Sequence, residues 1–339
     1  MKNKENCNVA IVGALGLVGS EMIRILEEKG FPVNELRPLD LPEYEGKEIA
    51  SQHQDVQTLA AVEENFKGID IALFSAGTSA SLLLAPKAAK QNVVVIDNSS
   101  AWRMNKDCPL IVPEVNSYDI SWHKGIIANP NCSTIQMVAV LKPLHDMFDI
   151  ERVVVSTYQA VSGGGRIAVE ELKKQSLTFL LGEKITHTKA SPHQIAFNVI
   201  PQIDVFEDAG YTKEENKMIN ETRKIMGAPY MKITATCVRV PIFYGHAEAI
   251  NIQTKKDINI HKTLEVLNKC EGIKIIDDPK TSDYPMPIIS EKNDKVMVGR
   301  IRRDFTVKNG LNLWVVANNI RKGAALNAVQ IAELLIKNG

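Results

Sequence analysis

The chain has 339 residues, which is long enough for two domains with separate cores. Its 40 basic and 40 acidic residues balance, so its charge gives no reason to expect binding to nucleic acid or to an anionic membrane. No apolar run reaches the roughly 18 residues of a membrane span, and the first residues lack the apolar segment of a signal peptide. We therefore expect a cytoplasmic protein that acts on a small molecule.

The first half of the chain alternates apolar strands with helices. Strands are expected at 8–12, 69–74, 93–97 and 125–128, and helices at 20–28, 79–91 and from Ser133 to near Pro143. Strand runs that are apolar almost throughout favour a parallel sheet covered on both faces, with ligands beyond the carboxyl ends of the strands. The sequence therefore predicts a Rossmann-like α/β domain in which the turns 13–19, 75–78, 98–103 and 129–132 converge on one crevice.

The turn 13–19 follows the first strand and carries three glycines in a GxxGxxG pattern. Gly13 and Gly16 would let backbone N–H groups approach a pyrophosphate at the start of the next helix. The pattern is not the GxGxxG of the usual dinucleotide fingerprint, so a tight turn without a ligand is the alternative.

Cys132 lies where a strand changes to a helix. Asn129-Pro130-Asn131 ends the strand, because proline fixes its own φ and biases the residue before it away from helix. The positive end of the following helix would favour a thiolate, which is the nucleophilic form. The alternative is a buried structural cysteine. The five cysteines are widely spaced without a CxxC pair, so neither a disulfide framework nor a metal site is expected.

The second half is expected to hold a mixed α+β domain. Strands are predicted at 153–159 and 311–317, a glycine-rich loop at 160–166, and helices at 167–181, 212–226 and 324–336. Thr212, with Glu215 three residues later, is typical of a capping box. We expect a first domain of 1–131, a second of 132–319, and a terminal helix within 320–339 that packs back on the first.

Arg239 and His246 stand out on the segment 236–246. An arginine flanked by apolar residues needs an anionic partner. His246 follows Gly245 at an expected turn and is an acid/base candidate, although a structural histidine is the alternative.

Seven motifs, in this order along the chain, resemble bacterial aspartate-semialdehyde dehydrogenases. They are Gly13–Gly19, Asn98–Arg103, Val112–Asn116, Asn129–Thr134, Tyr158–Gly163, Arg239–His246 and Arg321–Asn327. The resemblance implies reductive dephosphorylation of L-aspartyl 4-phosphate to L-aspartate 4-semialdehyde with NAD or NADP, in the biosynthesis of lysine, methionine and threonine. It also suggests a homodimer or homotetramer.

The resemblance also implies roles for individual residues. Cys132 would form a thioester, Gln159 would orient the substrate and His246 would be the acid/base. Arg239 would bind the substrate α-carboxylate, and Arg103 and Lys217 would hold the phosphate, with Glu214 nearby. The residues expected along the cofactor are Gly13, Leu15, Gly16, Leu17, Val18, Asp40, Gly77, Ser162, Gly163 and Asn319.

The chain departs from the family after the second strand. Family members often carry Ser-x-Arg-Ser-Ala-Gly-Lys there, whereas this chain has Leu41 at the serine and Glu43 at the arginine, between Asp40 and Glu45. Carboxylates accept hydrogen bonds from a free ribose hydroxyl and repel a 2′-phosphate. We therefore expect a weakened NADP preference; an acidic loop that faces solvent is the alternative.

Three other functions fit parts of the pattern. An N-acetyl-glutamyl-phosphate reductase would use the same thioester but should differ around Arg239. A cysteine hydrolase would have no use for a dinucleotide turn. A non-catalytic relative would be expected to lose the nucleophile or the acid/base, yet Cys132, Gln159, Arg239 and His246 are all present.

Overall fold

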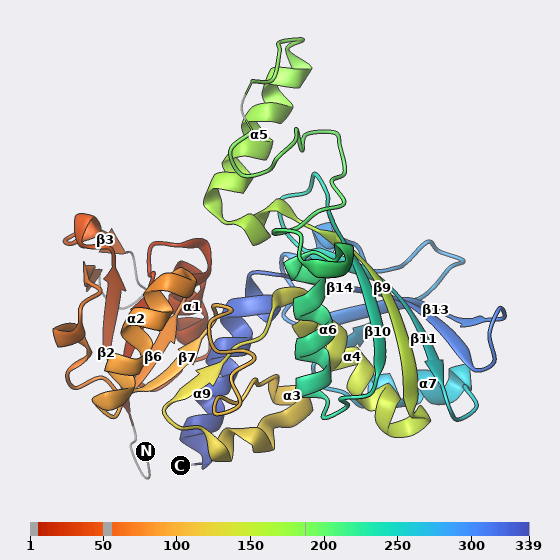
Figure 1. Ribbon diagram of the computed structural model, residues 1–339, viewed down its shortest axis with the longest axis horizontal. Helices are drawn as coiled ribbons and strands as arrows, with labels where there is room; N and C mark the ends of the chain where they lie inside the picture. Colours follow the sequence, from red (N-terminus) through yellow and green to blue (C-terminus); the bar gives the residue numbers. More distant parts are fainter. Residues whose placement is uncertain (1–5, 50–55, 187, 339) are drawn as a thin grey trace. The chain divides into compact units, whose positions relative to one another are not determined.

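The computed structural model describes residues 6–49, 56–186 and 188–338 (Figure 1). Internal contacts divide the chain into two compact units, residues 1–131 with 324–339 and residues 132–323. Gly339, the last residue of the segment 320–339 that is predicted to hold the terminal helix, lies outside the described residues. Within those ranges, no helix has both the length and the apolar character needed to cross a membrane.

The first unit is built on a six-stranded sheet in the order β5-β2-β1-β6-β7-β8, in which every neighbouring pair is parallel. The predicted parallel sheet is therefore confirmed. Its strands are β1 (Cys7–Val12), β2 (Val33–Asp40), β5 (Leu59–Ala60), β6 (Ile71–Phe74), β7 (Val94–Asp97) and β8 (Ile126–Ala128), and β3 (Glu48–Ile49) pairs separately with β4 (Val56–Gln57).

Helices cover both faces of this sheet. One apolar cluster joins α1 and α9 to the sheet, and a second joins α2 to its other face. The helices of this unit are α1 (Leu17–Glu28), η1 (Pro42–Tyr44), η2 (Glu63–Phe66), α2 (Gly77–Lys90), α3 (Pro113–Asn116), η3 (Ser117–Trp122) and α9 (Leu326–Asn338). Because the strands are parallel, the turns after β1, β6, β7 and β8 all leave the same edge of the sheet.

The first helix begins three residues earlier than predicted, at Leu17 instead of Ser20. Gly19 is thus inside the helix, where an added Cβ would collide with the carbonyl of Gly13. The sequence analysis placed Gly19 in the turn. In the structure it belongs to the helix, and because it has no side chain the helix packs closely on the turn.

The second unit has a six-stranded mixed sheet in the order β10-β9-β11-β14-β13-β12. The outer pairs β10/β9 and β12/β13 are parallel, and the inner pairs are antiparallel. The strands are β9 (Ile150–Gln159), β10 (Lys232–Arg239), β11 (His246–Thr254), β12 (Ile273–Ile275), β13 (Val296–Asp304) and β14 (Gly310–Ala317).

Helices α4, α6 and α7 contact this sheet, and α5 extends away from it (Figure 1). The helices are α4 (Cys132–Phe148), η4 (Val161–Gly164), α5 (Arg166–Leu180), η5 (Asp208–Gly210), α6 (Lys213–Ile225), α7 (Ile260–Asn268) and α8 (Pro287–Ser290). The π-helical turn η6 (Arg321–Ala325) precedes α9.

The end predicted for α4 near Pro143 is wrong, since the helix continues to Phe148. A proline inside a helix costs about 3 kcal/mol. Leu144 and Phe148 continue the buried face at helical spacing, and burying a large apolar side chain contributes about 1.5–3 kcal/mol. Two such side chains offset the cost of the proline.

Candidate active site

Cys132 is the first residue of α4, as predicted, and its residue surface is partly accessible. The position lets the thiol benefit from the unpaired N–H groups and the positive dipole of the helix start. Gly323 lies directly behind it, because an added Cβ at Gly323 would be 2.9 Å from the Cys132 Cβ. Of the other four cysteines, Cys7, Cys108 and Cys237 are buried and Cys270 is partly accessible.

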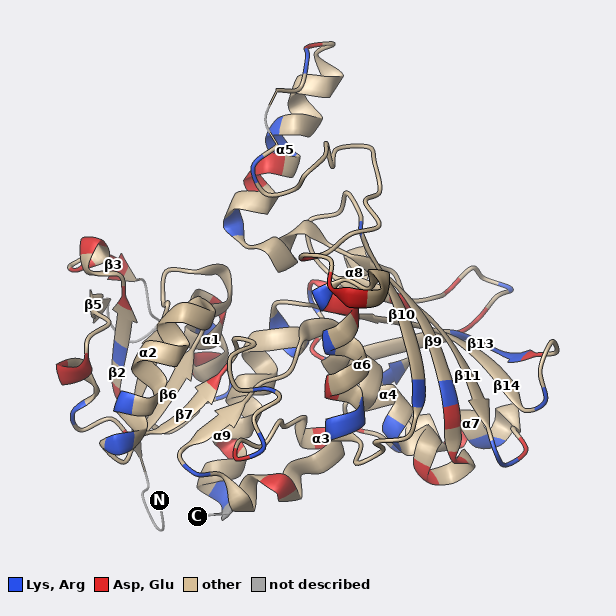
Figure 2. Cartoon of the chain, in the orientation of Figure 1, with Lys and Arg blue, Asp and Glu red and all other residues tan. Residues whose placement is uncertain are grey.

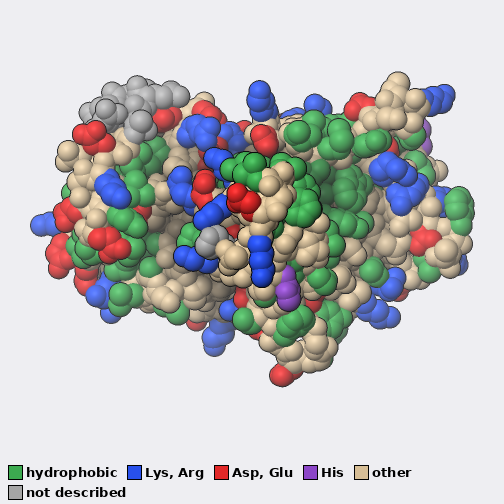
Figure 3. Space-filling model, turned by 90° about the horizontal axis from the view of Figure 1, so that it is seen from above, with side chains coloured by type: hydrophobic (Ala, Val, Ile, Leu, Met, Phe, Trp, Pro, Cys, Tyr) green, Lys and Arg blue, Asp and Glu red, His purple; other side chains and the backbone are tan. Residues whose placement is uncertain are grey.

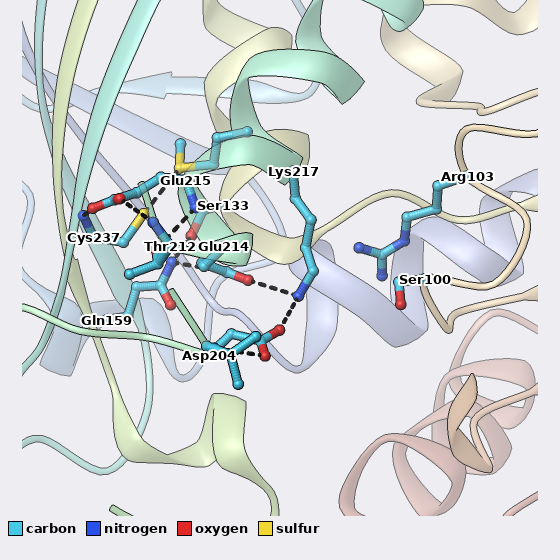
Figure 4. Close-up of polar contacts among 12 residues, drawn as sticks. Ser100, Arg103, Ser133, Gln159, Asp204, Thr212, Glu214, Glu215, Lys217 and Cys237 are labelled. Atoms are coloured by element: carbon cyan, nitrogen blue, oxygen red, sulfur yellow. Dashed lines mark hydrogen bonds and ion pairs between the residues drawn. The ribbon is translucent and has the colours of Figure 1, made fainter. Parts of the chain in front are cut away.

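Gln159 ends β9 and is almost fully buried. Its Nε2 donates to Ser133 Oγ at 2.6 Å and to Glu214 Oε1 at 3.2 Å (Figure 4). Ser133 directly follows Cys132, so these bonds fix the amide beside the start of α4.

The backbone of Ala160 connects the other two candidates, Arg239 and His246. Its N–H donates to His246 Nδ1 at 3.1 Å, and its carbonyl accepts a hydrogen bond from Arg239 Nη1 at 2.6 Å. Arg239 ends β10 beside Gln159, its partner in the parallel pair, and Glu214 is the carboxylate whose charge acts on it most strongly.

His246 is completely buried. Burial, and then the charge of Arg239, lower its pKa to about 3, so the imidazole is neutral at neutral pH. Since Nδ1 accepts a hydrogen bond, the neutral ring carries its proton on Nε2. Nε2 has no hydrogen-bond partner among the described residues.

Ser162, Gly163 and Asn319 lie next to His246. Asn319 Nδ2 donates to Ser162 Oγ at 3.0 Å, and its Oδ1 accepts from the backbone N–H of Gly245 at 2.8 Å. A Cβ on Gly163 would be 3.0 Å from Arg239 Nη1 and 3.3 Å from His246 Nε2. Only a residue without a side chain leaves that space open.

Lys217 lies on α6, one turn after Glu214. Its Nζ donates to Asp204 Oδ2 at 2.8 Å and to Glu214 Oε2 at 3.2 Å (Figure 4). The two carboxylates raise the pKa of Lys217 against the opposing effect of its burial. The second unit thus brings together six of the predicted side chains, namely Cys132, Gln159, Glu214, Lys217, Arg239 and His246.

Arg103 and the glycine turn belong to the first unit. The Arg103 guanidinium is largely buried and donates to the carbonyls of Asn129 and Asn98 at 3.0 and 2.9 Å. Gly13 has a φ of +81°, and an added Cβ would be 2.6 Å from the carbonyl oxygen of Ser75. Its conformation and its close neighbour both require glycine.

The acidic residues after β2 differ in their surroundings. Asp40 is buried, and its two carboxylate oxygens accept hydrogen bonds from the backbone N–H groups of Leu15 and Leu41, each at 2.9 Å. Glu43 and Glu45 are exposed, and acidic residues are visible around β3 in Figure 2. Asp40 therefore anchors the glycine turn, while each of its oxygens keeps a further lone pair.

Two features of the second unit escaped the sequence analysis. Asp204 pairs with Lys217 from a loop with no recognisable motif. Glu248, two residues after His246 on β11, is completely buried beside Gln136. A histidine and an acid two residues apart on a strand lie on the same face of the sheet, so the sequence could have suggested that Glu248 lies near His246. The burial of Glu248 could not be inferred from the sequence.

Comparison with known proteins identifies the family. Two family profiles match the chain, the semialdehyde dehydrogenase NAD binding domain over 8–123 and the semialdehyde dehydrogenase dimerisation domain over 141–322. An aspartate-semialdehyde dehydrogenase from Aquifex aeolicus is 57% identical over 98% of both chains, and one from Bacillus subtilis is 48% identical over 97% of both. A crystal structure titled aspartate semialdehyde dehydrogenase II complexed with ASA, from Vibrio cholerae, is 47% identical with a TM-score of 0.96 and covers 99% of both chains. The chain therefore belongs to the aspartate-semialdehyde dehydrogenase family, with a Rossmann-like NAD(P)-binding domain and a mixed-sheet dimerisation domain.

Proposed function

We propose that this oxidoreductase converts L-aspartyl 4-phosphate to L-aspartate 4-semialdehyde and phosphate through a thioester on Cys132, in the cytoplasm. The family membership supports the reaction. The observation that carries the residue assignments is the grouping of a helix-start thiol with Gln159, Arg239 and His246 in one unit.

The first chemical step belongs to Cys132. The thiolate attacks the acyl carbon, a carbon–sulfur bond forms and the carbon–oxygen bond to phosphate breaks. A thioester accepts hydride far better than a carboxylate does, so covalent capture replaces one difficult reduction by two easier steps.

The charged groups recognise the two ends of the substrate. The planar Arg239 guanidinium suits the α-carboxylate, and the Glu214 carboxylate suits the α-ammonium. Lys217 and Arg103 are assigned to the phosphate, whose charge grows as the carbon–oxygen bond breaks. Gln159, fixed by Ser133 and Glu214, orients the acyl group.

His246 acts at the substrate oxygen. With its proton on Nε2, it donates a hydrogen bond to the thioester oxygen and stabilises the charge that develops there. This is the acid half of the role expected from the sequence. Because Gly163 has no side chain, no Cβ crowds Nε2, which a Cβ there would approach to 3.3 Å.

The first unit has a cradle that fits a dinucleotide. Gly13 and Gly19 leave no room for side chains, and the turn precedes the N-terminus of α1. The residues of the first unit that we assign to the cofactor are Gly13, Leu15, Gly16, Leu17, Val18, Asp40 and Gly77. The family resemblance also assigns Ser162, Gly163 and Asn319 to the cofactor. The cofactor supplies the hydride when it is bound.

We assign the acidic loop a weakened preference for NADP. Asp40 ends β2, where a carboxylate can accept a ribose hydroxyl, and Glu43 replaces a cation that would favour a 2′-phosphate. The double variant Leu41→Ser/Glu43→Arg should raise the ratio of kcat/KM for NADP to that for NAD. Glu48→Arg adds the same charge elsewhere on this exposed surface and should leave the ratio unchanged; equal ratios in all three proteins would contradict the assignment.

The assay that tests the proposed reaction runs it in reverse, with aspartate semialdehyde, phosphate and NAD or NADP. Turnover should require phosphate. The semialdehyde of N-acetylglutamate serves as the competing substrate, because its acylated amine cannot pair with Glu214 as an ammonium does. Faster turnover of the acetylated substrate would favour the related reductase instead.

We also propose that the chain forms a homodimer through α5 and the loop after it. This region exposes large apolar side chains, and Figure 3, which looks down on α5, shows hydrophobic side chains on this surface. Its exposed residues, between 50% and 73% accessible, are Ile167, Leu177, Phe179, Leu180, Leu181 and Phe197. Exposed apolar surface of this kind is typical of interfaces.

Analytical ultracentrifugation tests the interface. Leu180→Glu should shift the chain toward monomers, because it buries a charge in the contact. Leu82→Glu alters an equally apolar exposed residue on α2 of the first unit and should not. A dimer unaffected by Leu180→Glu would exclude this surface.

A further inference from the structure

The Asp204 carboxylate forms an ion pair with Lys217, the cation that we assign to phosphate binding. The Lys217 side chain is 19% exposed and lies between Asp204, which is 33% exposed, and Glu214, which is 6% exposed. One positive charge therefore faces two negative charges (Figure 4). Glu214 also acts on Arg239, so Asp204 is the added negative charge beside the cation that would hold a phosphate dianion, and this charge is unfavourable for phosphate binding.

The two carboxylates have different further partners. Glu214 also accepts a hydrogen bond from Gln159 and acts on Arg239, so it is part of the substrate-binding group. The second oxygen of Asp204 accepts, within the described part of the chain, a local hydrogen bond alone, from the backbone N–H of Val205 at 2.9 Å. Asp204 thus makes its ion pair with Lys217 and is otherwise held by its own loop.

The loop fixes the direction of this carboxylate. Asp204 has a φ of 67°, a left-handed conformation that aspartate tolerates better than most residues. Gln202 Nε2 donates to the Asp204 carbonyl at 3.2 Å. Asp204 also lines a pocket of about 100 Å³ together with Arg239, the residue assigned to the substrate α-carboxylate.

We propose that Asp204 is a built-in counter-anion that competes with phosphate for Lys217. The inference rests on the proposed phosphate role of Lys217. When phosphate binds to Lys217, the phosphate and the Asp204 carboxylate share one ammonium group, and the two anions repel each other. The competition lowers the affinity for phosphate and helps the product to leave once the thioester has formed.

The charge needed for this competition is present at neutral pH. Burial would raise the pKa of Asp204, but the hydrogen bonds from Lys217 and Val205 outweigh burial and lower it. Asp204 therefore remains a carboxylate throughout the neutral range.

The test replaces Asp204 by asparagine, which keeps the shape and the acceptor for Val205. In the phosphate-consuming direction, Asp204→Asn should lower the KM for phosphate by roughly three- to tenfold. Calorimetric titration of the full-length protein with inorganic phosphate should show a matching increase in affinity. Asp204→Ala also removes the competing charge and should act in the same direction.

Asp208→Asn is the matched control, because Asp208 is an exposed acid on the same loop. It should leave the phosphate KM unchanged. A phosphate KM that rises or stays constant in both Asp204 variants would overturn the competition and leave Asp204 as a residue that merely positions Lys217.

Lys217→Met separates this result from a failure of the proposed function. It should raise the phosphate KM strongly in an enzyme that still oxidises aspartate semialdehyde. An active Lys217→Met enzyme with an unchanged phosphate KM would refute both the assignment of Lys217 to phosphate and the inference about Asp204. A wild-type protein that shows no phosphate-dependent oxidation of aspartate semialdehyde would refute the proposed function itself.

Discussion

The backbone N–H and carbonyl of one residue, Ala160, bind two side chains, His246 and Arg239, that the sequence singled out separately. Arg239 and His246 could be singled out because a cation among apolar residues and a histidine after a glycine turn are unusual. Their shared partner could not be inferred, because it depends on the pairing of β9 with both β10 and β11. The tautomer of neutral His246 follows from the Ala160 N–H, and its neutral state follows from burial and the charge of Arg239; no local motif predicts either.

Neutral His246 makes stability depend on pH in a defined window. An unfolded histidine takes up a proton below about pH 6.5, whereas His246 resists protonation until about pH 3. Its contribution is therefore present above pH 6.5 and is lost as the pH falls toward 3. The loss should be smaller in His246→Gln than in the wild type, measured as the free energy of unfolding in urea between pH 7.5 and about 5.

His261→Gln is the control for this series, since the His261 side chain is 81% exposed. The free energy of unfolding of His261→Gln should change with pH as steeply as that of the wild type. A His246→Gln slope equal to that of the wild type would mean that His246 titrates normally in the folded protein.

Glu248 should have the opposite dependence. Burial raises its pKa well above the ordinary value of 4.5, and neither carboxylate oxygen has a hydrogen-bond partner among the described residues. The folded state therefore holds a proton that the unfolded state releases, and stability is lost as the pH rises from about 4.5 through the raised pKa. Glu248→Gln, which is neutral at every pH, should gain stability relative to the wild type between pH 5 and 8.

The measurement is the same unfolding series, with Glu271→Gln as an exposed control. A constant difference between Glu248→Gln and the wild type across that range would show that Glu248 is not held neutral.

At the scale of helices and strands, patterns formed by residues close together in the sequence predicted the structure most reliably. The capping box predicted for the helix that carries Glu214 and Lys217 is confirmed: Thr212 Oγ1 accepts from Glu215 N, and Glu215 Oε2 accepts from Thr212 N. These contacts involve residues three apart, so their pattern is visible in the sequence. The end of α4 was missed because burial beyond Pro143 depends on distant residues.

The cap gives a prediction for α6. Thr212→Ala removes the acceptor and should lower the free energy of unfolding by about 1 kcal/mol, while Thr212→Ser keeps an acceptor and should retain most of the stability. Thermal and urea unfolding would measure both. Equal losses in the two variants would indicate that packing of the Thr212 methyl group, and not the cap, is what matters.

At the scale of the whole molecule, the sequence predicted the parallel sheet of the first unit because alternating strands and helices allow few other arrangements. It gave no strand order for the second unit, whose mixed sheet pairs strands far apart in the chain. The residue types of the site were recoverable from motifs. The partner Asp204 was not, since it comes from a loop that only the fold brings to Lys217.

The central claim is that Cys132 carries the acyl group. Full-length enzyme would be mixed with aspartate semialdehyde and oxidised cofactor without phosphate, quenched in acid and analysed by peptide mass spectrometry. The account predicts an aspartyl adduct on the peptide containing Cys132, one burst of reduced cofactor per active site, and neither in Cys132→Ala. Adduct formation elsewhere, or an undiminished burst in Cys132→Ala, would contradict it.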